Sequence, residues 1–231
     1  MKVALIADVH SNIFALEAVY ADLEREGVDK IFVIGDLIGY YYWPKQVVQL
    51  LRADPRVFCI RGNHESILGE IRSDPSKADY YRGKYGTGYD VCLSELDQAE
   101  MDWLLSLPCS ADIDIAGASF HLSHGALGSV DKYIYPDASL ETLTENLSGS
   151  TFTVFGHTHY AFAHTSDNQI LINPGSVGQP RDVGGLASYA IVNLENRTVR
   201  FKRKQFDVSR LTSVAKQRDP QLAYLWKIMS K

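Results

Sequence analysis

KVALIADVHSNIFALEAVYADLEREGVDKIFVIGD, residues 2–36, is the stretch that decides the fold. Its first and last segments, KVALIA (residues 2–7) and KIFVIGD (residues 30–36), each contain a continuous apolar run. Such runs are typical of strands that are buried on both faces of a sheet. Between these runs, Leu16, Val19, Tyr20 and Leu23 fall at helical spacing. Asn12 or Ser11 can cap this helix, and Gly27 can end it. The stretch therefore predicts a β-α-β unit with parallel strands and a right-handed connection.

The same alternation continues along the chain. Residues 44–51 predict a short helix with Pro at its first turn, and residues 56–64 predict a third strand. This β-α-β-α-β order favours an α/β fold with a mainly parallel sheet. After residue 110 the apolar period changes to two, which indicates hairpins that turn at Gly117, near Asp167 and near Glu195.

Length and composition favour a single domain that spans residues 1–231. Apolar residues make up 45% of the chain, enough for a sizeable core, and no linker divides it. Residues 66–93 are rich in Gly, Tyr and charge, so we expect a cap-like excursion over one end of the sheet. Residues 208–231 predict an amphipathic helical tail that packs on the body or on a partner subunit.

Charge and cysteine usage restrict the partners and the compartment. The formal net charge of -5 argues against long nucleic acid or an anionic membrane as the main partner. Three cysteines, an odd count without zinc-ribbon spacing, suit a reducing compartment. No apolar run has the length of a signal peptide or a membrane span. We therefore expect a cytoplasmic protein.

Groups that can bind metals stand at the ends of five predicted strands. In chain order they are Asp8 and His10, Asp36, Asn63 and His64, His124, and His157 with His159. In an open α/β sheet, ligands bind at the carboxyl ends of the strands. Helix capping or a turn could explain each residue alone, but not their joint occurrence at matching strand ends. The pattern predicts one shared metal site.

The donor types indicate which metals this site would hold. Carboxylates, an amide oxygen and several imidazoles exceed the needs of one ion, and no thiolate is among them. Mixed oxygen and nitrogen ligands suit Mn, Fe, Zn, Co or Ni in a hydrolytic centre. Asp36 lies between the two groups in chain order and could bridge two ions, which together would attract an anionic phosphate.

The motifs DVH, GD, GNHE, HG and GHTH, which stand in this order between residues 8 and 159, resemble the signature of the calcineurin-like metallophosphoesterase superfamily. The phrase NPGSVGQPR, residues 173–181, resembles the small bacterial and archaeal phosphodiesterase branch of that superfamily. The resemblance implies a four-layer α/β/β/α sandwich with two mixed β-sheets. It also implies a phosphoesterase, a phosphodiesterase rather than a monoesterase, that uses a metal-bridging hydroxide as nucleophile.

Residue by residue, the resemblance implies two metal sites. Asp8, His10 and His159 would hold the first ion, Asn63, His124 and His157 the second, and Asp36 would bridge both. His64 would bind no metal but would act as general acid or stabilise the transition state. Glu65 stands where many relatives have Asp and would orient His64.

Several roles stay open at this point. Asn12 could contact the substrate phosphate or cap the first helix, and Arg181 could contact phosphate or anchor its loop. The run Tyr40–Trp43 could stack on a nucleobase, or it could pack internally or at a contact between the subunits of a homo-oligomer. His121 and His164 are expected to be ordinary core or surface histidines.

The expected partner is a small phosphate-ester substrate, with no membrane contact. Three alternatives remain: a phosphomonoesterase or protein phosphatase, a non-catalytic scaffold on the same fold, and a hydrolase of another metal family. The second is disfavoured because every motif keeps its metal-binding residue. The third is disfavoured because amidohydrolase sites open with H-x-H, whereas this chain opens with D-x-H.

Overall fold

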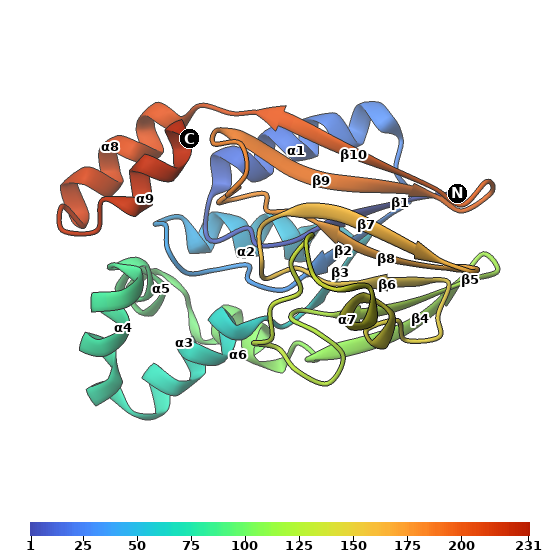
Figure 1. The fold of residues 1–231 in the computed structure, drawn as a ribbon. Coiled ribbons are helices and arrows are strands. Elements are labelled where there is room, and N and C mark those ends of the chain that lie inside the picture. Colours follow the sequence, from blue (N-terminus) through green and yellow to red (C-terminus); the bar gives the residue numbers. More distant parts are fainter.

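Two five-stranded sheets stacked face to face form the centre of the molecule (Figure 1). The computed structural model describes residues 1–231. The first sheet has the order β10-β9-β1-β2-β3, in which β1, β2 and β3 are parallel and β9 and β10 are antiparallel to their neighbours. Its strands are β1 (Lys2–Ile6), β2 (Lys30–Ile34), β3 (Val57–Ile60), β9 (Leu186–Asn193) and β10 (Thr198–Gln205).

The second sheet has the order β4-β5-β6-β8-β7. Strands β5, β6 and β8 are parallel, while β4 and β7 pair antiparallel at the two edges. Its strands are β4 (Ser110–Ile115), β5 (Ala118–Ser123), β6 (Phe152–Val154), β7 (Ala161–Ser166) and β8 (Gln169–Pro174). Both sheets are therefore mixed, as the family resemblance implied, and the turns expected at Gly117, Asp167 and Glu195 join β4–β5, β7–β8 and β9–β10.

The alternation of side chains along β1 separates two cores. Val3 and Leu5 point between the sheets and belong to a core that includes Phe120 and Phe152 of the second sheet. Ala4 and Ile6 point to the other face and belong to a core that includes the apolar residues of the first two helices. A strand with buried neighbours on both faces needs an uninterrupted apolar run, which explains the composition of residues 2–7.

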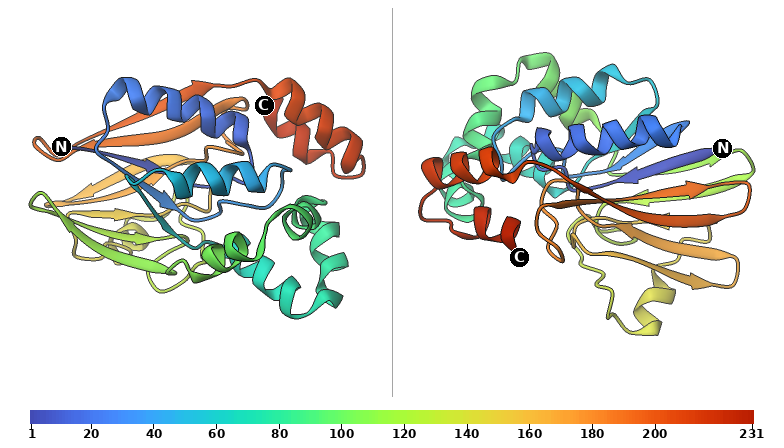
Figure 2. Two further views of the ribbon diagram at one scale, coloured as in Figure 1. Left: turned by 180° about the vertical axis from the view of Figure 1, so that it is seen from behind. Right: turned by 90° about the horizontal axis from the view of Figure 1, so that it is seen from above.

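Helices form the outer layers (Figures 1 and 2). They are α1 (Ile13–Glu26), α2 (Pro44–Ala53), α3 (Asn63–Ser73), α4 (Ala78–Tyr85), α5 (Gly88–Glu95), α6 (Gln98–Ser106), α7 (Leu140–Glu145), α8 (Val208–Arg218) and α9 (Tyr224–Lys227), with 3₁₀ turns at Pro75–Lys77 and Ile228–Ser230. α1 and α2 cover the first sheet, and α7 lies over a smaller apolar cluster on the second. None of these helices combines the length and apolar character that a bilayer crossing requires.

The excursion and the tail gather at the end of the sheets to which β1 runs (Figure 1). Residues 66–93 are mainly helical, since they contain most of α3 together with α4 and α5. In the tail, Leu225 is fully buried in the core, and its carbonyl accepts a hydrogen bond of 3.0 Å from the Tyr41 hydroxyl. The Tyr42 hydroxyl donates to Asp219 at 2.7 Å. Tyr41 and Tyr42 thus pack internally and hold the tail.

The third strand is shorter than residues 56–64, the range that the apolar pattern predicts. β3 ends at Ile60, and Asn63 and His64 form the first turn of α3. The Glu65 carboxylate accepts the Gly62 N–H at 2.8 Å and so satisfies a backbone donor at the start of α3. Glu at the third helical position is the sequence signal for this earlier helix start.

Candidate metal centre

The structure brings all seven side chains that were predicted as metal ligands into one buried cluster. They come from the loops after β1 (Asp8, His10), β2 (Asp36), β5 (His124) and β6 (His157, His159), and from the start of α3 (Asn63). Each is at most 9% exposed to solvent. The first sheet supplies four of these residues and the second supplies three, so the cluster lies where the two sheets meet.

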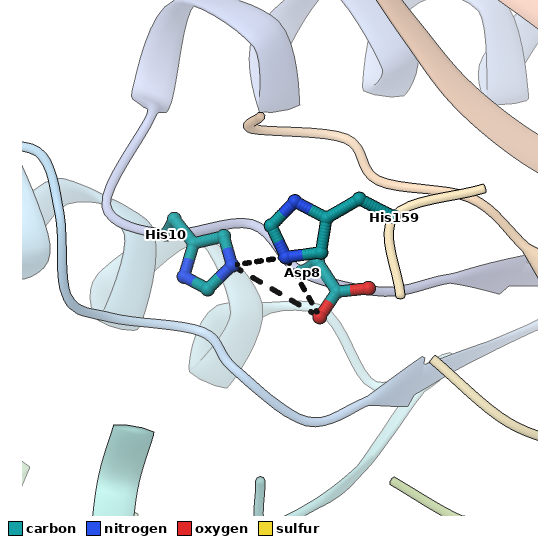
Figure 3. A group of neighbouring side chains, drawn as sticks. All are labelled: Asp8, His10 and His159. Atoms are coloured by element: carbon teal, nitrogen blue, oxygen red, sulfur yellow. Dashed lines mark hydrogen bonds and ion pairs between the residues drawn. The ribbon is translucent and has the colours of Figure 1, made fainter. Parts of the chain in front are cut away.

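One half of the cluster consists of Asp8, His10 and His159, which point toward one another (Figure 3). The Nδ1 atom of His10 lies 3.2 Å from the Ile38 carbonyl, and the Nδ1 atom of His159 lies 2.7 Å from the Gln179 carbonyl. A carbonyl only accepts hydrogen bonds, so both Nδ1 atoms carry the proton and both Nε2 atoms present a lone pair.

These two lone pairs face each other. The Nε2 atoms of His10 and His159 are 3.0 Å apart, and the Asp8 Oδ1 lies 4.0 Å from the first and 3.7 Å from the second. Three buried acceptors at these distances repel one another unless a cation lies among them. The donor set therefore fits a divalent metal ion.

The other half of the cluster has the same character. The Nδ1 atom of His124 donates to the Ile34 carbonyl at 2.7 Å, and its Nε2 atom lies 3.2 Å from both Asp36 Oδ2 and Asn63 Oδ1. The Nε2 atom of His157 donates to the Asp131 carbonyl at 3.2 Å, which leaves its Nδ1 as the acceptor. Once His124 is deprotonated, Asp36, His124 and His157 all present acceptors, so this group also fits a metal ion.

Asp36 lies between the two halves. Its Oδ2 is 3.2 Å from the Nε2 of His124 and 3.9 Å from the Nε2 of His10. Its other oxygen, Oδ1, accepts the backbone N–H of His64 at 2.9 Å. The position of Asp36 fits the bridging role that its place in the chain suggested.

Burial and the mutual charges of the cluster shift the pKa values of its side chains. Burial raises the pKa of Asp8 to about 8. Burial alone would lower the pKa of His124, but the carboxylates of Asp36 and Asp8 raise it to about 10. Burial lowers the pKa values of His10 and His159 well below the usual value. In the metal-free protein, protons on Asp8 and His124 therefore take the place of cations.

Metal binding should release protons at pH 7. Both pKa values, about 8 for Asp8 and about 10 for His124, lie above 7, so both groups are protonated before a cation binds. Ligands must be deprotonated, so we expect one proton from each group and an apparent affinity that rises with pH up to about pH 10, the pKa of His124. Calorimetric titration with Mn²⁺ in two buffers of different ionisation enthalpy measures the release. Binding without proton release at pH 7 would contradict this charge distribution.

The backbone of the cluster is unusual. Asp8, His10, Asp36, His157 and His159 all have φ between 51° and 65°, in the left-handed region that residues other than glycine seldom adopt. Glycines permit the close approach of the loops. A Cβ atom on Gly62 would lie 2.2 Å from Asp36 Oδ1, and one on Gly178 would lie 1.9 Å from the Val9 carbonyl oxygen. The geometry of the cluster thus depends on the loops as much as on the side chains.

His64 differs from the histidines of the cluster in the partner of its Nδ1 atom. That atom is 2.7 Å from the hydroxyl of Tyr89, a buried residue of α5. His64 is the only hydrogen-bond partner of this hydroxyl, so the hydroxyl must donate to remain satisfied. The Nε2 atom, 3.9 Å from Asp36 Oδ2, then carries a proton. Burial lowers the pKa of His64 to about 4, so the ring is neutral at pH 7.

Glu65 does not orient His64, contrary to what the family resemblance implied. Its carboxylate accepts backbone N–H groups from Asp36, Leu37 and Ile38 at 2.8–3.1 Å, besides that of Gly62. Glu65 therefore shapes the loop that carries Asp36. Tyr89 takes the position next to His64 that was expected for Glu65, because α5 packs against the start of α3.

Asn12 and Arg181 have different environments. The Asn12 side chain accepts the Ala15 N–H at 3.2 Å and donates to the Gly178 carbonyl at 2.8 Å, and the residue is fully buried. Both of its hydrogen-bonding groups are used inside the fold, as the capping alternative requires.

Arg181 lines a cavity of about 120 Å³ together with Asp36, His64 and His159. Burial raises the pKa of Asp8, whereas the positive charges of His124 and Arg181 lower it.

Sequence reasoning missed several residues of this cavity. They are Lys84 and Tyr85 of α4 and Tyr133 of the loop before α7. The density of tyrosine in YYRGKYGTGY, residues 80–89, was the available signal. The two remaining histidines lie elsewhere: His121 pairs with Asp112 at the surface, and His164 is a half-buried residue of β7.

Comparison with known proteins gives consistent matches. The model of the calcineurin-like phosphoesterase superfamily domain matches residues 1–197. The uncharacterized protein MJ0912 of Methanocaldococcus jannaschii is 30% identical over 239 residues, 95% of this chain and 94% of that protein. A metallophosphoesterase from Sphaerobacter thermophilus superimposes with a TM-score of 0.80 at 26% identity, over 100% of this chain and 99% of that chain. The hypothetical protein PH1004 of Pyrococcus horikoshii shares the fold, with a TM-score of 0.84 at 20% identity over 99% and 97% of the two chains.

Proposed function

This chain belongs to the calcineurin-like phosphoesterase superfamily, and we propose that it is a phosphodiesterase that depends on two divalent metal ions. The observation that carries the proposal is the pair of opposed lone pairs on His10 and His159, 3.0 Å apart in a buried site. A protein does not keep such a contact without a cation, since each lone pair would be an unsatisfied buried acceptor.

The two halves of the cluster suggest how the ions would be shared. Asp8, His10 and His159 would hold one, Asn63, His124 and His157 the other, and Asp36 would contact both. Oxygen and nitrogen ligands without sulfur are compatible with Mn, Fe, Zn, Co or Ni. When bound, two such ions supply the Lewis acidity that activates water and offsets the charge of the phosphoryl oxygens.

The remaining polar groups of the cavity have roles that follow from their positions. Arg181 and Lys84 line the cavity and form no ion pair with a carboxylate, so both are free to bind the phosphate anion. His64 also lines the cavity, and its protonated Nε2 could donate a hydrogen bond to the leaving oxygen of the substrate and stabilise the negative charge that develops there.

The space beside the cluster supports a diester as substrate. A second cavity of about 360 Å³ adjoins the first and shares Asn63, Tyr85 and His157 with it. A phosphodiester has two substituents on phosphorus, and only one leaves in a single turnover. The second substituent therefore needs room next to the reacting phosphate, which a monoester does not.

Metal removal and replacement test the proposal. Protein treated with a chelator should not hydrolyse bis(p-nitrophenyl) phosphate, and added Mn²⁺ should restore the activity. We expect kcat/KM for this diester to exceed that for p-nitrophenyl phosphate by about tenfold or more, or about 1.4 kcal/mol in activation free energy. Folded, metal-loaded protein that turns over neither compound would overturn the enzyme assignment in favour of a non-catalytic scaffold. A preference for the monoester would overturn the diester assignment alone.

A further inference from the structure

Four tyrosines line the 360 Å³ cavity. Tyr80, Tyr81 and Tyr85 come from α4, and Tyr133 comes from the loop before α7. The Tyr133 side chain stacks on the His157 ring, with 4.0 Å between ring centroids. Tyr80 is 67% exposed and Tyr133 is 46% exposed. Exposed aromatic rings that converge on a cavity beside a reactive centre are typical of a site that binds a planar ligand group.

Polar groups in the same cavity distinguish it from a purely apolar slot. Ser66, Glu70 and Asp131 line it along with the tyrosines, and the Tyr81 hydroxyl donates to Glu70 at 3.0 Å. Lys84 borders both cavities, and its Nζ lies 4.9 Å from the centre of the Tyr85 ring. A ligand that fits would combine a flat ring, polar ring edges and an anionic group near Lys84.

We propose that this cavity is a subsite for the base of a nucleoside phosphodiester, a substrate class that rests on the proposed function. His64 lines the smaller cavity but not this one. Since His64 assists the leaving oxygen, the group that occupies the tyrosine-walled cavity is the ester substituent that stays on phosphorus. The nucleoside therefore remains on the phosphate after one hydrolysis.

Two diesters with the same leaving group test the subsite. Thymidine 5′-(p-nitrophenyl) phosphate carries a base, whereas methyl p-nitrophenyl phosphate does not, and both release p-nitrophenol. We expect kcat/KM of the native protein to favour the thymidine ester by about tenfold, the range that stacking of one base provides. Tyr81→Ser should remove most of this preference and leave the methyl ester rate unchanged. Tyr80→Ser should reduce the preference in the same direction.

The controls distinguish an effect on base binding from an effect on the hydrolysis step. Phe201→Ser removes an exposed aromatic ring from β10, which does not line the cavity, and should keep the preference. Equal rates on both diesters, or an equal loss on both in Tyr81→Ser, would overturn the subsite. If the native protein hydrolyses neither, the proposed function fails. In that case the subsite is tested by calorimetry, which compares the affinity for thymidine 5′-monophosphate with that for methyl phosphate. Equal affinities would overturn the subsite.

Discussion

Asp36→Asn should reduce metal-dependent hydrolysis by about 10³-fold or more, a loss of about 4 kcal/mol in transition-state stabilisation. Asp36 Oδ2 faces His124 at 3.2 Å and His10 at 3.9 Å, so this one carboxylate serves both halves of the cluster. An amide has no negative charge to offer either ion. We therefore also expect less metal bound per chain, measured by elemental analysis after dialysis.

A loss of folding would imitate this result, so the variant needs a stability measurement. In the metal-free protein, the Asp36 carboxylate lies 3.2 Å from the Nε2 of His124, whose pKa the carboxylates of Asp36 and Asp8 raise to about 10. Asp36→Asn leaves the buried His124 imidazolium without this partner, so the metal-free variant should unfold at a lower denaturant concentration than the metal-free native protein, and activities have to be compared per amount of folded protein. Asp112→Asn, which changes an exposed carboxylate, is the matched control and should keep full activity. Full activity in Asp36→Asn would contradict the metal centre.

His64→Gln should lower kcat by about 10²–10³-fold, the usual cost of removing one positioned hydrogen-bond donor to a developing negative charge. Metal content should not change, because the Nε2 atom of His64 carries a proton where the ligand histidines present a lone pair. The loss should grow as the leaving group becomes more basic, since a more basic leaving oxygen gains more from the hydrogen bond. Rates for a series of aryl methyl phosphodiesters with different phenol pKa values measure this dependence.

Tyr89→Phe provides the matched variant for this second prediction. It removes only the hydroxyl that lies 2.7 Å from His64 Nδ1 and keeps the packing of the ring. The proton of the imidazole can then move to Nδ1, so we expect a smaller loss than in His64→Gln with the same leaving-group dependence. A uniform loss for all leaving groups, in either variant, would show that His64 does not act on the leaving oxygen.

Strand direction explains why the cluster could be predicted from the sequence. β1, β2 and β3 are parallel, so the residues that follow them must meet at one edge of the first sheet. The same holds for β5 and β6 in the second sheet. Strand direction thus groups DVH, GD and GNHE on the first sheet and HG and GHTH on the second. The stacking of the two sheets, which brings the two groups together, was implied by the family resemblance and not by strand direction.

Contacts that cross between helices could not be predicted in this way. Tyr89 meets His64 because two helices and a 3₁₀ turn fold the excursion back over the cluster, and no periodicity in residues 66–93 gives that path. Glu65 shows a different limit. Its side chain was assigned to His64 by resemblance, but four backbone N–H groups lie closer and bind the carboxylate. The apolar pattern of a sequence does not indicate where backbone N–H groups of this kind will lie.

The left-handed backbone at Asp8, His10, Asp36, His157 and His159 has a consequence for protein engineering. Copying the seven side chains onto the strand ends of another α/β scaffold would not reproduce this geometry, because an ordinary loop would aim them elsewhere. A successful graft has to transplant the loops whole, including Gly62 and Gly178, whose backbones pass too close to their neighbours for any larger residue.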